Sequence, residues 1–260
     1  MKILAILTKE WLELRRERSQ IWTSLLMPLL LSIMPAGIMF LIRTTPDEDT
    51  STIGMVLADP SLTGFDSIEL SQAVIGRQFG LMLLLLPVLL PGIIAAYSIV
   101  GEKNNRTLEP LLATPVPTWQ LLLAKCLAAI IPSVVLTWVA ATIFTIGIGF
   151  SAISPRTLSA VISPAWLVLV VLGGPLLGAI SIALSVAVSS RVSDPRTAQQ
   201  LTGVLVVPLL LLVFGQLFGV VVLNLALVLI CCLVLAILAV GALWIAVQIF
   251  QRETILTRWR

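Results

Sequence analysis

The hydrophobic and polar positions of this chain are separated into long blocks. Six blocks are almost entirely apolar, and each approaches or exceeds the roughly 20 residues with which an α-helix crosses a hydrocarbon core. Charged residues fall between the blocks or at their ends. The pattern predicts an all-α membrane protein with six transmembrane helices. They are expected over Ile21–Ile42, Phe79–Val100, Leu121–Phe150, Ala165–Val188, Leu201–Phe218 and Val221–Phe250.

A shorter amphipathic pattern precedes the first block. Ile3, Leu7, Trp11 and Leu14 recur every three or four residues and form one apolar stripe on a helix. The charged residues of the segment fall off this stripe: Lys9, Glu10, Glu13, Arg16 and Glu17. We predict an amphipathic helix over residues 1–19 that lies in the head-group region, with its tryptophan at the interface. A solvated helix leading into the first span is the alternative.

The composition agrees with a membrane protein and narrows the chemistry. Hydrophobic residues make up 58% of the chain and charged residues 11%, against roughly 25% charged residues in soluble domains. The chain contains no histidine, which excludes histidine-based metal sites, haem ligation and acid–base catalysis. We predict no catalytic residue, no metal site and no cofactor in this chain, and no nucleic-acid partner.

The distribution of positive charge predicts the orientation. Thirteen of the 16 Lys and Arg residues fall on the side of the N-terminus, and Arg43, Arg77 and Arg156 fall on the other side. Such a bias marks the cytoplasmic side of a membrane protein. We therefore predict a multi-pass protein of the cell membrane with both termini in the cytoplasm. The segment from Arg43 to Arg77 is expected to be a short outer loop, so residues 1–260 form one transmembrane domain.

The predicted spans contain no Asp, Glu, Lys or Arg away from their ends. Ion-coupled transporters carry ionisable residues near the bilayer midplane, so this absence argues against an ion-coupled transporter or an intramembrane enzyme. The chain also lacks the G-x-x-x-x-G-K-[ST] sequence that holds nucleotide phosphates. Energy from ATP would therefore have to come from a partner.

Small residues recur at spacings of three and four in the fourth block. Small residues at this spacing allow close helix approach in lipid. They form either a dimer or pathway face, or a packing surface within one bundle. These residues are Gly174, Gly178, Ser181, Ser185 and Ser189.

The polar stretch over residues 101–120 is longer than a simple connection requires. Asn104 or Asn105 is suited to cap a short helix, which Pro115 and Pro117 would end. Its apolar side would carry Leu108, Leu111 and Leu112. Such a helix offers leucines to a groove of a partner, with charged residues around them. A solvated loop that contains leucines is the alternative.

The stretch GEKNNRTLEPLLATPVPTWQLLLAK, from Gly101 to Lys125, resembles the motif of ABC-2 type transporter permeases. Asn105 and Ala124 depart from the usual pattern. The sequence SSRVSDPRTAQQ, over Ser189–Gln200, is similar to the family's cytoplasmic turn between the fourth and fifth spans. The matching residues are Glu102, Lys103, Arg106, Thr107, Leu108, Leu111, Leu112, Pro115, Trp119 and Lys125.

The resemblance implies a type V (ABC-2) exporter fold and a permease subunit. Two such subunits, identical or related, would pair with cytoplasmic ATPase subunits that bind ATP and magnesium. Residues 101–120 would form the coupling loop that docks on the ATPase. The implied docking residues are Glu102, Lys103, Arg106, Thr107, Leu108, Glu109, Leu111, Leu112 and Pro115.

A pathway for export would run along the dimer interface, within membrane lipid. Its candidate residues are Tyr97, Gln199, Gln200 and Gln216, and packing contacts are the alternative for each. A non-transporting membrane anchor or assembly factor that recruits the ATPase is the other function that the same loop allows. The sequence does not indicate the substrate.

Overall fold

The computed structural model describes residues 2–16, 18–44, 62–104, 118–189, 192 and 194–249. In these residues the regular structure is helical and includes no strand. Six helical passages are long and apolar enough to cross a membrane, so the prediction of an all-α protein with six spanning helices is confirmed. They run over Leu25–Thr44, Ser67–Ser98, Gln120–Ser151, Pro155–Ser189, Arg196–Leu217 and Leu225–Gln248.

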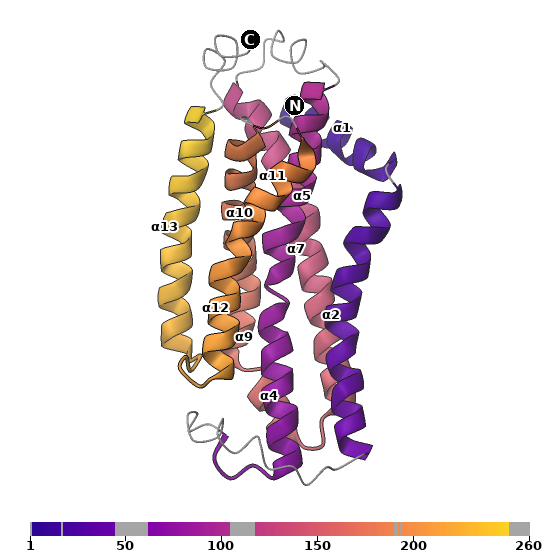
Figure 1. Ribbon diagram of the computed structural model, residues 1–260, viewed down its shortest axis with the longest axis vertical. Coiled ribbons are helices and arrows are strands. Elements are labelled where there is room, and N and C mark those ends of the chain that lie inside the picture. Colours follow the sequence, from indigo (N-terminus) through magenta and orange to yellow (C-terminus); the bar gives the residue numbers. More distant parts are fainter. Residues whose placement is uncertain are drawn as a thin grey trace.

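The spanning helices stand side by side in one elongated bundle (Figure 1). Helix α1 (Lys2–Arg16) lies across one end of the bundle, and α13 (Leu225–Ile249) finishes at the same end. We call this the N-terminal end. The opposite end carries the turn between α12 (Val206–Leu217) and α13, and we call it the hairpin end.

Helices α2 (Arg18–Thr44) and α7 (Thr118–Ser151) pack along each other. Met39 of α2 and Phe144 of α7 are fully buried in one core cluster. Gln72 secures the hairpin end of this pair, because its amide nitrogen donates to the carbonyl oxygens of Met39, at 2.9 Å, and Ser151, at 3.2 Å. This pairing satisfies a polar side chain that is fully buried.

The second span is broken near its middle. Helix α4 (Ser67–Met82) ends, and α5 (Leu85–Asn104) begins, on either side of Leu83 and Leu84. Pro87 has no N–H to donate to the carbonyl of Leu83, and the N–H of Leu86 donates to it instead, at 3.1 Å. Both leucines at the break are buried. The irregular backbone is thus enclosed by protein, as a break at membrane depth requires.

The fourth span is also assembled from several pieces. It begins with α8 (Pro155–Val161) and α9 (Pro164–Val168), continues as the π-helical segment η3 (Leu169–Gly173) and ends as α10 (Gly174–Ser189). Ser154 and Ser163 cap the first two pieces, accepting from the N–H groups of Thr157 and Trp166. In both caps a proline follows at the first helical position.

The fifth passage consists of α11 (Pro195–Thr202), the 3₁₀ turn η4 (Gly203–Leu205) and α12. The turn between α12 and the last helix uses both Gly219 and Asn224. Gly219 has a positive φ of 69°, which glycine adopts at little cost. The Asn224 side chain accepts from the N–H of Leu227 at 2.8 Å and caps α13.

Two expectations about the hairpin end are wrong. The segment from Arg43 to Arg77 is not a loop throughout, because α4 is helical from Ser67, well before the predicted start at Phe79. The second span therefore contains Glu69 and Arg77, although no charged residue was expected there. The fourth passage likewise starts at Pro155, before the predicted Ala165, because the two capped helices precede it. Residues 45–61 lie outside the described part.

Candidate functional site

Two long helices, α5 and α7, lie next to each other in the sequence on either side of residues 105–117, and α5 ends and α7 begins at the N-terminal end of the bundle (Figure 1). Helix α5 ends at Asn104 and α7 begins at Thr118. Glu102 and Lys103, two predicted docking residues, lie in the last turn of α5. The other predicted docking residues lie outside the described residues: Arg106, Thr107, Leu108, Glu109, Leu111, Leu112 and Pro115.

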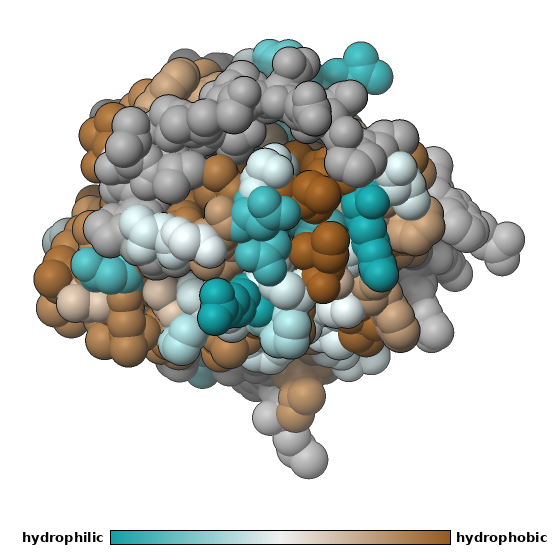
Figure 2. Space-filling model, turned by 90° about the horizontal axis from the view of Figure 1, so that it is seen from below, coloured by the Kyte–Doolittle hydropathy of each residue, from teal (hydrophilic) through white to brown (hydrophobic). Residues whose placement is uncertain are grey.

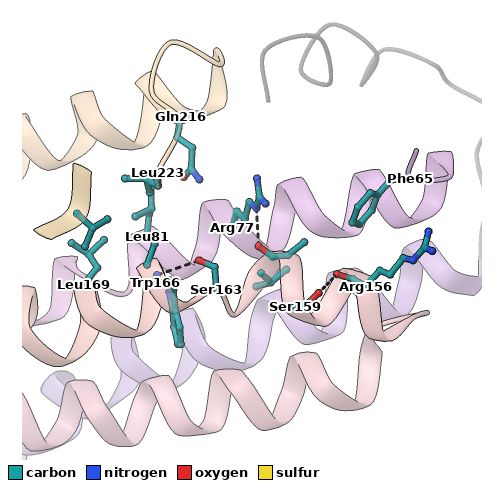
Figure 3. Close-up of a pocket in the computed structure, with 14 residues that line it drawn as sticks. Phe65, Arg77, Leu81, Arg156, Ser159, Ser163, Trp166, Leu169, Gln216 and Leu223 are labelled. Carbon is teal, nitrogen blue, oxygen red and sulfur yellow. Dashed lines mark hydrogen bonds between the residues drawn. The ribbon is translucent and has the colours of Figure 1, made fainter. Parts of the chain in front are cut away.

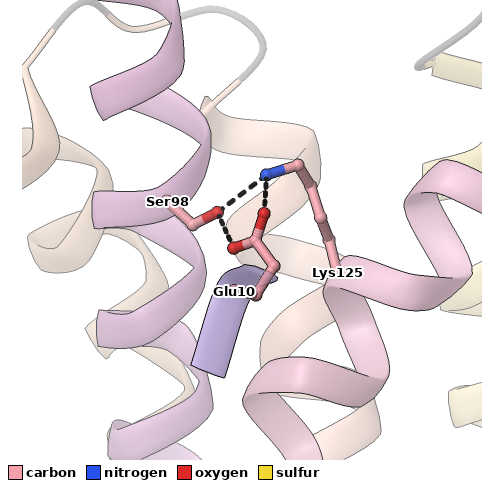
Figure 4. A network of polar contacts seen from close by, with 3 residues as sticks. All are labelled: Glu10, Ser98 and Lys125. Atoms are coloured by element: carbon pink, nitrogen blue, oxygen red, sulfur yellow. Dashed lines mark hydrogen bonds and ion pairs between the residues drawn. The ribbon is translucent and has the colours of Figure 1, made fainter. Parts of the chain in front are cut away.

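A buried polar network lies one to two turns inside this connection. Glu10 of α1, Ser98 of α5 and Lys125 of α7 form a closed triangle (Figure 4). The Lys125 Nζ donates to Glu10 Oε1 at 2.7 Å and to Ser98 Oγ at 2.9 Å, and Ser98 Oγ donates to Glu10 Oε2 at 2.8 Å. The network therefore connects α1 directly to both helices that bound residues 105–117.

Both charges of the network are buried, with 5% of Glu10 and 6% of Lys125 exposed. Burial raises the pKa of the Glu10 carboxyl. The positive charge of Lys125 and the hydrogen bonds from Lys125 and Ser98 outweigh this effect, so the pKa lies below its usual value. Glu10 is consequently ionised at neutral pH. Each charge depends on the other, because an unpaired buried charge is strongly unfavourable.

A second contact holds α1 against α7. The indole N–H of Trp11 donates to the carbonyl oxygen of Ala128 at 3.2 Å. Trp11 was predicted to lie in the head-group region, and 40% of the residue is exposed. Glu10 was placed off the apolar stripe, and in the structure its side chain turns inward to Lys125. Helix α1 is therefore fixed to the bundle by polar contacts as well as by its apolar face.

Helix α5 is also connected to the fourth span by hydrogen bonds. The Ser181 hydroxyl of α10 donates to the carbonyl of Val88, and that of Ser185 donates to the carbonyl of Gly92, at 3.0 Å. A Cβ atom at Gly92 would lie 2.9 Å from Thr202 Cγ2 and 3.0 Å from Ser181 Oγ. The close approach supports the packing interpretation of the small residues at Ser181 and Ser185.

The four predicted pathway residues do not form one cluster. Tyr97 lies on α5, and Gln199 and Gln200 lie on α11. These two helices pack together at the N-terminal end through Ala96 and Ala198. Gln216 lies in the last turn of α12, at the hairpin end. Three of the residues are thus on neighbouring helices, and the fourth lies at the other end of the bundle.

Gln216 lines a cavity at the hairpin end. The cavity has a volume of about 380 Å³ and lies among α4, α8, α9, α12 and α13. Hydrophilic and hydrophobic side chains lie side by side on this face of the molecule (Figure 2). Arg77 and Arg156 contribute positive charge to the lining, and Trp166 and Leu169 contribute apolar surface (Figure 3). The cavity therefore offers both kinds of surface to one ligand.

The polar network was not predicted from the sequence, although two local signals point to it. Glu10 falls three residues after Leu7 and four before Leu14, which places it at the edge of the apolar stripe of α1. Lys125 follows Leu121 and Leu122, both of which are buried. An acidic and a basic residue that each interrupt an apolar helical face are suited to pair. The sequence did not show that these two would meet.

Comparison with known proteins identifies a family. Residues 4–230 match the family described as "ABC-2 family transporter protein". The match includes all but the first two residues of α1, the segment between α5 and α7, and the residues of the polar network. No curated protein matches the chain.

Proposed function

The chain belongs to the ABC-2 family of transporter proteins, and we propose that it forms the export pathway of an ATP-driven transporter whose ATPase is a separate subunit. The family is a membrane transport component and is not itself an ATPase. The direction of transport and the partner are the parts that we propose. ATP and magnesium would be bound by the ATPase, and two copies or paralogues of the permease would pair in the membrane.

One observation carries this proposal: the polar network joins α1 to α5 and α7, the two helices that precede and follow residues 105–117 in the sequence. If a partner moves that segment, a rigid connection between α5 and α7 delivers the movement to two spans together. Helix α5 would pass it on to α10, because Ser181 and Ser185 bind its backbone. These contacts would determine which spans move.

The orientation supports a cytoplasmic partner. The helix α1, the end of α5 and the start of α7 lie at one end of the bundle. Thirteen of the 16 basic residues belong to that side in the sequence, which is the usual cytoplasmic bias. We propose that the N-terminal end faces the cytoplasm and that both termini lie there, in the cell membrane.

The docking surface would be formed by the segment that the family motif covers. We propose that its leucines enter a groove of the ATPase, with charged residues forming ion pairs around them. Tyr97, Gln199 and Gln200 stay candidates for the inner part of the pathway, and Gln216 for its outer part. The proposed docking residues are Glu102, Lys103, Arg106, Thr107, Leu108, Glu109, Leu111, Leu112 and Pro115.

The proposal is tested by purifying the tagged full chain from its native membrane in mild detergent and identifying the proteins that accompany it. We expect a stoichiometric P-loop ATPase, which is lost when Leu108, Leu111 and Leu112 are all replaced by Ser. The matched control replaces Leu4 and Leu12, two exposed leucines of α1, and should retain the ATPase.

Two outcomes would contradict the proposal. One is the absence of any ATPase from repeated mild preparations, and the other is equal loss of the ATPase in the α1 control. Reconstitution of the complex in liposomes then separates a transporter from an anchor. A transporter responds to its substrate with a change in ATP hydrolysis, whereas an anchor does not.

A further inference from the structure

The cavity at the hairpin end is polarised along its length. Figure 3 shows Leu169, Leu81 and Leu223 toward one end, and Arg156 and Phe65 at the other. Ser163, Gln216 and Arg77 lie between them. None of the described residues that line the cavity is acidic. The lining thus gains basic side chains in the direction of the hairpin end, and the surroundings of a membrane amphiphile likewise become polar toward its head group.

The two arginines of the lining come from different elements. The Nε–H of Arg77 on α4 donates to the carbonyl oxygen of Ala160 on α8 at 2.8 Å, which fixes its guanidinium group at the wall. Arg156 lies in the first turn of α8, and its side chain is exposed. Guanidinium groups are suited to bind phosphate or carboxylate groups, and the two arginines place positive charge at separate points along the cavity.

Gln216 adds an unsatisfied acceptor to the same wall. Its Oε1 atom is buried and has no hydrogen-bond partner among the described residues. A buried acceptor without a donor is unfavourable, and a hydroxyl group on a ligand would supply the donor. The wall therefore selects a head group that carries both a negative charge and a hydroxyl or N–H donor.

The surroundings of the cavity indicate that the ligand arrives from the bilayer. The turn between α12 and α13 stops short of the ends of α2 and α4 (Figure 1). Its tip exposes Phe218 by 73% and Val220 by 79%. Exposed apolar side chains at this level are stable in contact with hydrocarbon. Acyl chains can thus lie beside the turn while a head group enters the cavity.

We infer that this cavity binds the head group of an acidic membrane amphiphile. The acidic group lies in the part of the cavity that carries Arg77 and Arg156, its donor meets Gln216, and the first part of the chain follows Leu81, Leu169 and Leu223. The volume is within the range of about 300–1,000 Å³ that is usual for small-molecule sites. In the orientation proposed above, the ligand belongs to the outer leaflet. The inference does not depend on an ATPase.

The test uses the full chain in phosphatidylcholine nanodiscs into which phosphatidylglycerol is titrated. Phosphatidylglycerol carries one phosphate and free hydroxyl groups, so it matches the wall. Quenching of Trp166 fluorescence by brominated acyl chains reports the ligand, and the Trp166→Phe variant gives the background from the other tryptophans. We expect quenching by brominated phosphatidylglycerol at mole fractions at which brominated phosphatidylcholine quenches little.

Two variants address the arginines. Arg156→Gln should weaken phosphatidylglycerol binding about fivefold, the factor that corresponds to one basic side chain near an anionic lipid surface. Arg77→Gln should have an effect of the same size or larger. Arg43→Gln is the matched control, because Arg43 is an exposed arginine in the last turn of α2 and does not line the cavity.

Three results would overturn the inference. Equal quenching by both lipids, or an Arg43→Gln variant that loses as much binding as Arg156→Gln, would overturn the inference. Competition by free glycerol phosphate as strong as that by the lipid would show a site for a soluble anion and would also overturn it. Binding is measured without an ATPase, so failure here leaves the proposed function standing, and failure of the proposed function leaves this result unaffected.

Discussion

The polar network and the cavity at the hairpin end both contain polar and charged side chains. These side chains are paired with one another in the network and only partly paired in the cavity. In the network, both carboxylate oxygens of Glu10 and the hydroxyl of Ser98 have hydrogen-bond partners, and the buried Lys125 donates to both residues. In the cavity, polar groups surround a space, and Gln216 Oε1 has no partner among the described residues. Closed pairing favours one fixed arrangement, whereas incomplete pairing leaves hydrogen-bonding capacity for a ligand.

The largest expected effect comes from breaking the network. Lys125→Met leaves the Glu10 carboxylate buried without its counter-charge, which costs about 3–5 kcal/mol of folding free energy. We expect a marked loss of folded protein, measured by thermal unfolding followed by size-exclusion chromatography. The double variant Glu10→Gln with Lys125→Met should recover most of the stability, because it removes both charges.

Lys9→Met is the control for this experiment, since Lys9 is exposed and adjacent to Glu10. Its effect should be much smaller. Equal destabilisation by Lys9→Met and Lys125→Met would show that the buried pair has no special role, and so would a double variant as unstable as Lys125→Met alone.

The next prediction tests the close packing of α5 against α10 at Gly92. Gly92→Ala places a methyl group against Thr202 and Ser181, at 2.9 and 3.0 Å, and such overpacking costs about 1–3 kcal/mol. Gly101→Ala is the matched control on the same helix, because nothing lies within 4 Å of its added Cβ. We expect a lower melting temperature for Gly92→Ala and an unchanged or higher one for Gly101→Ala. The reverse order would contradict the packing of α5 on α10.

A pH scan tests the lowered pKa of the Glu10 carboxyl. Its folded-state pKa lies below the usual 4.5, so the stability from this carboxylate is present above pH 4.5 and is lost as the pH falls through the folded-state pKa. The wild-type protein should therefore lose stability in this acidic range relative to the Glu10→Gln, Lys125→Met double variant. Parallel curves for the two proteins from about pH 7 to about pH 3 would contradict the lowered pKa.

The smallest effect is expected in the cavity. Gln216→Met removes an acceptor that has no described partner, so in delipidated protein the unfolding free energy should stay the same or rise by about 1 kcal/mol. The comparison variant is Ser98→Ala, which removes a paired hydroxyl and should lower the unfolding free energy by about 1 kcal/mol. Thermal unfolding of both proteins in one detergent measures the difference. A larger loss for Gln216→Met would show that its side chain is satisfied in the protein.

The sequence by itself determined the membrane architecture. Long apolar blocks can be stable only across a bilayer, and a helix satisfies its own backbone groups there without help from the rest of the chain. The number of spans, the amphipathic helix at the start and the turn near Gly219 are all local properties of this kind. The family motif over residues 101–125 is likewise a local pattern, and it correctly indicated the ABC-2 family.

The tertiary structure alone decided which of the few polar residues meet. Glu10 and Lys125 are separated by 115 positions, and neither residue's neighbours in the sequence indicate the other. The same holds for Gln216, Arg77 and Arg156, which come from three elements and form one cavity wall. Hydrophobic periodicity fixes which residues enter the membrane. The packing of α1 against α7 buried one ion pair, and the packing of α4, α8, α9, α12 and α13 left a cavity at the opposite end.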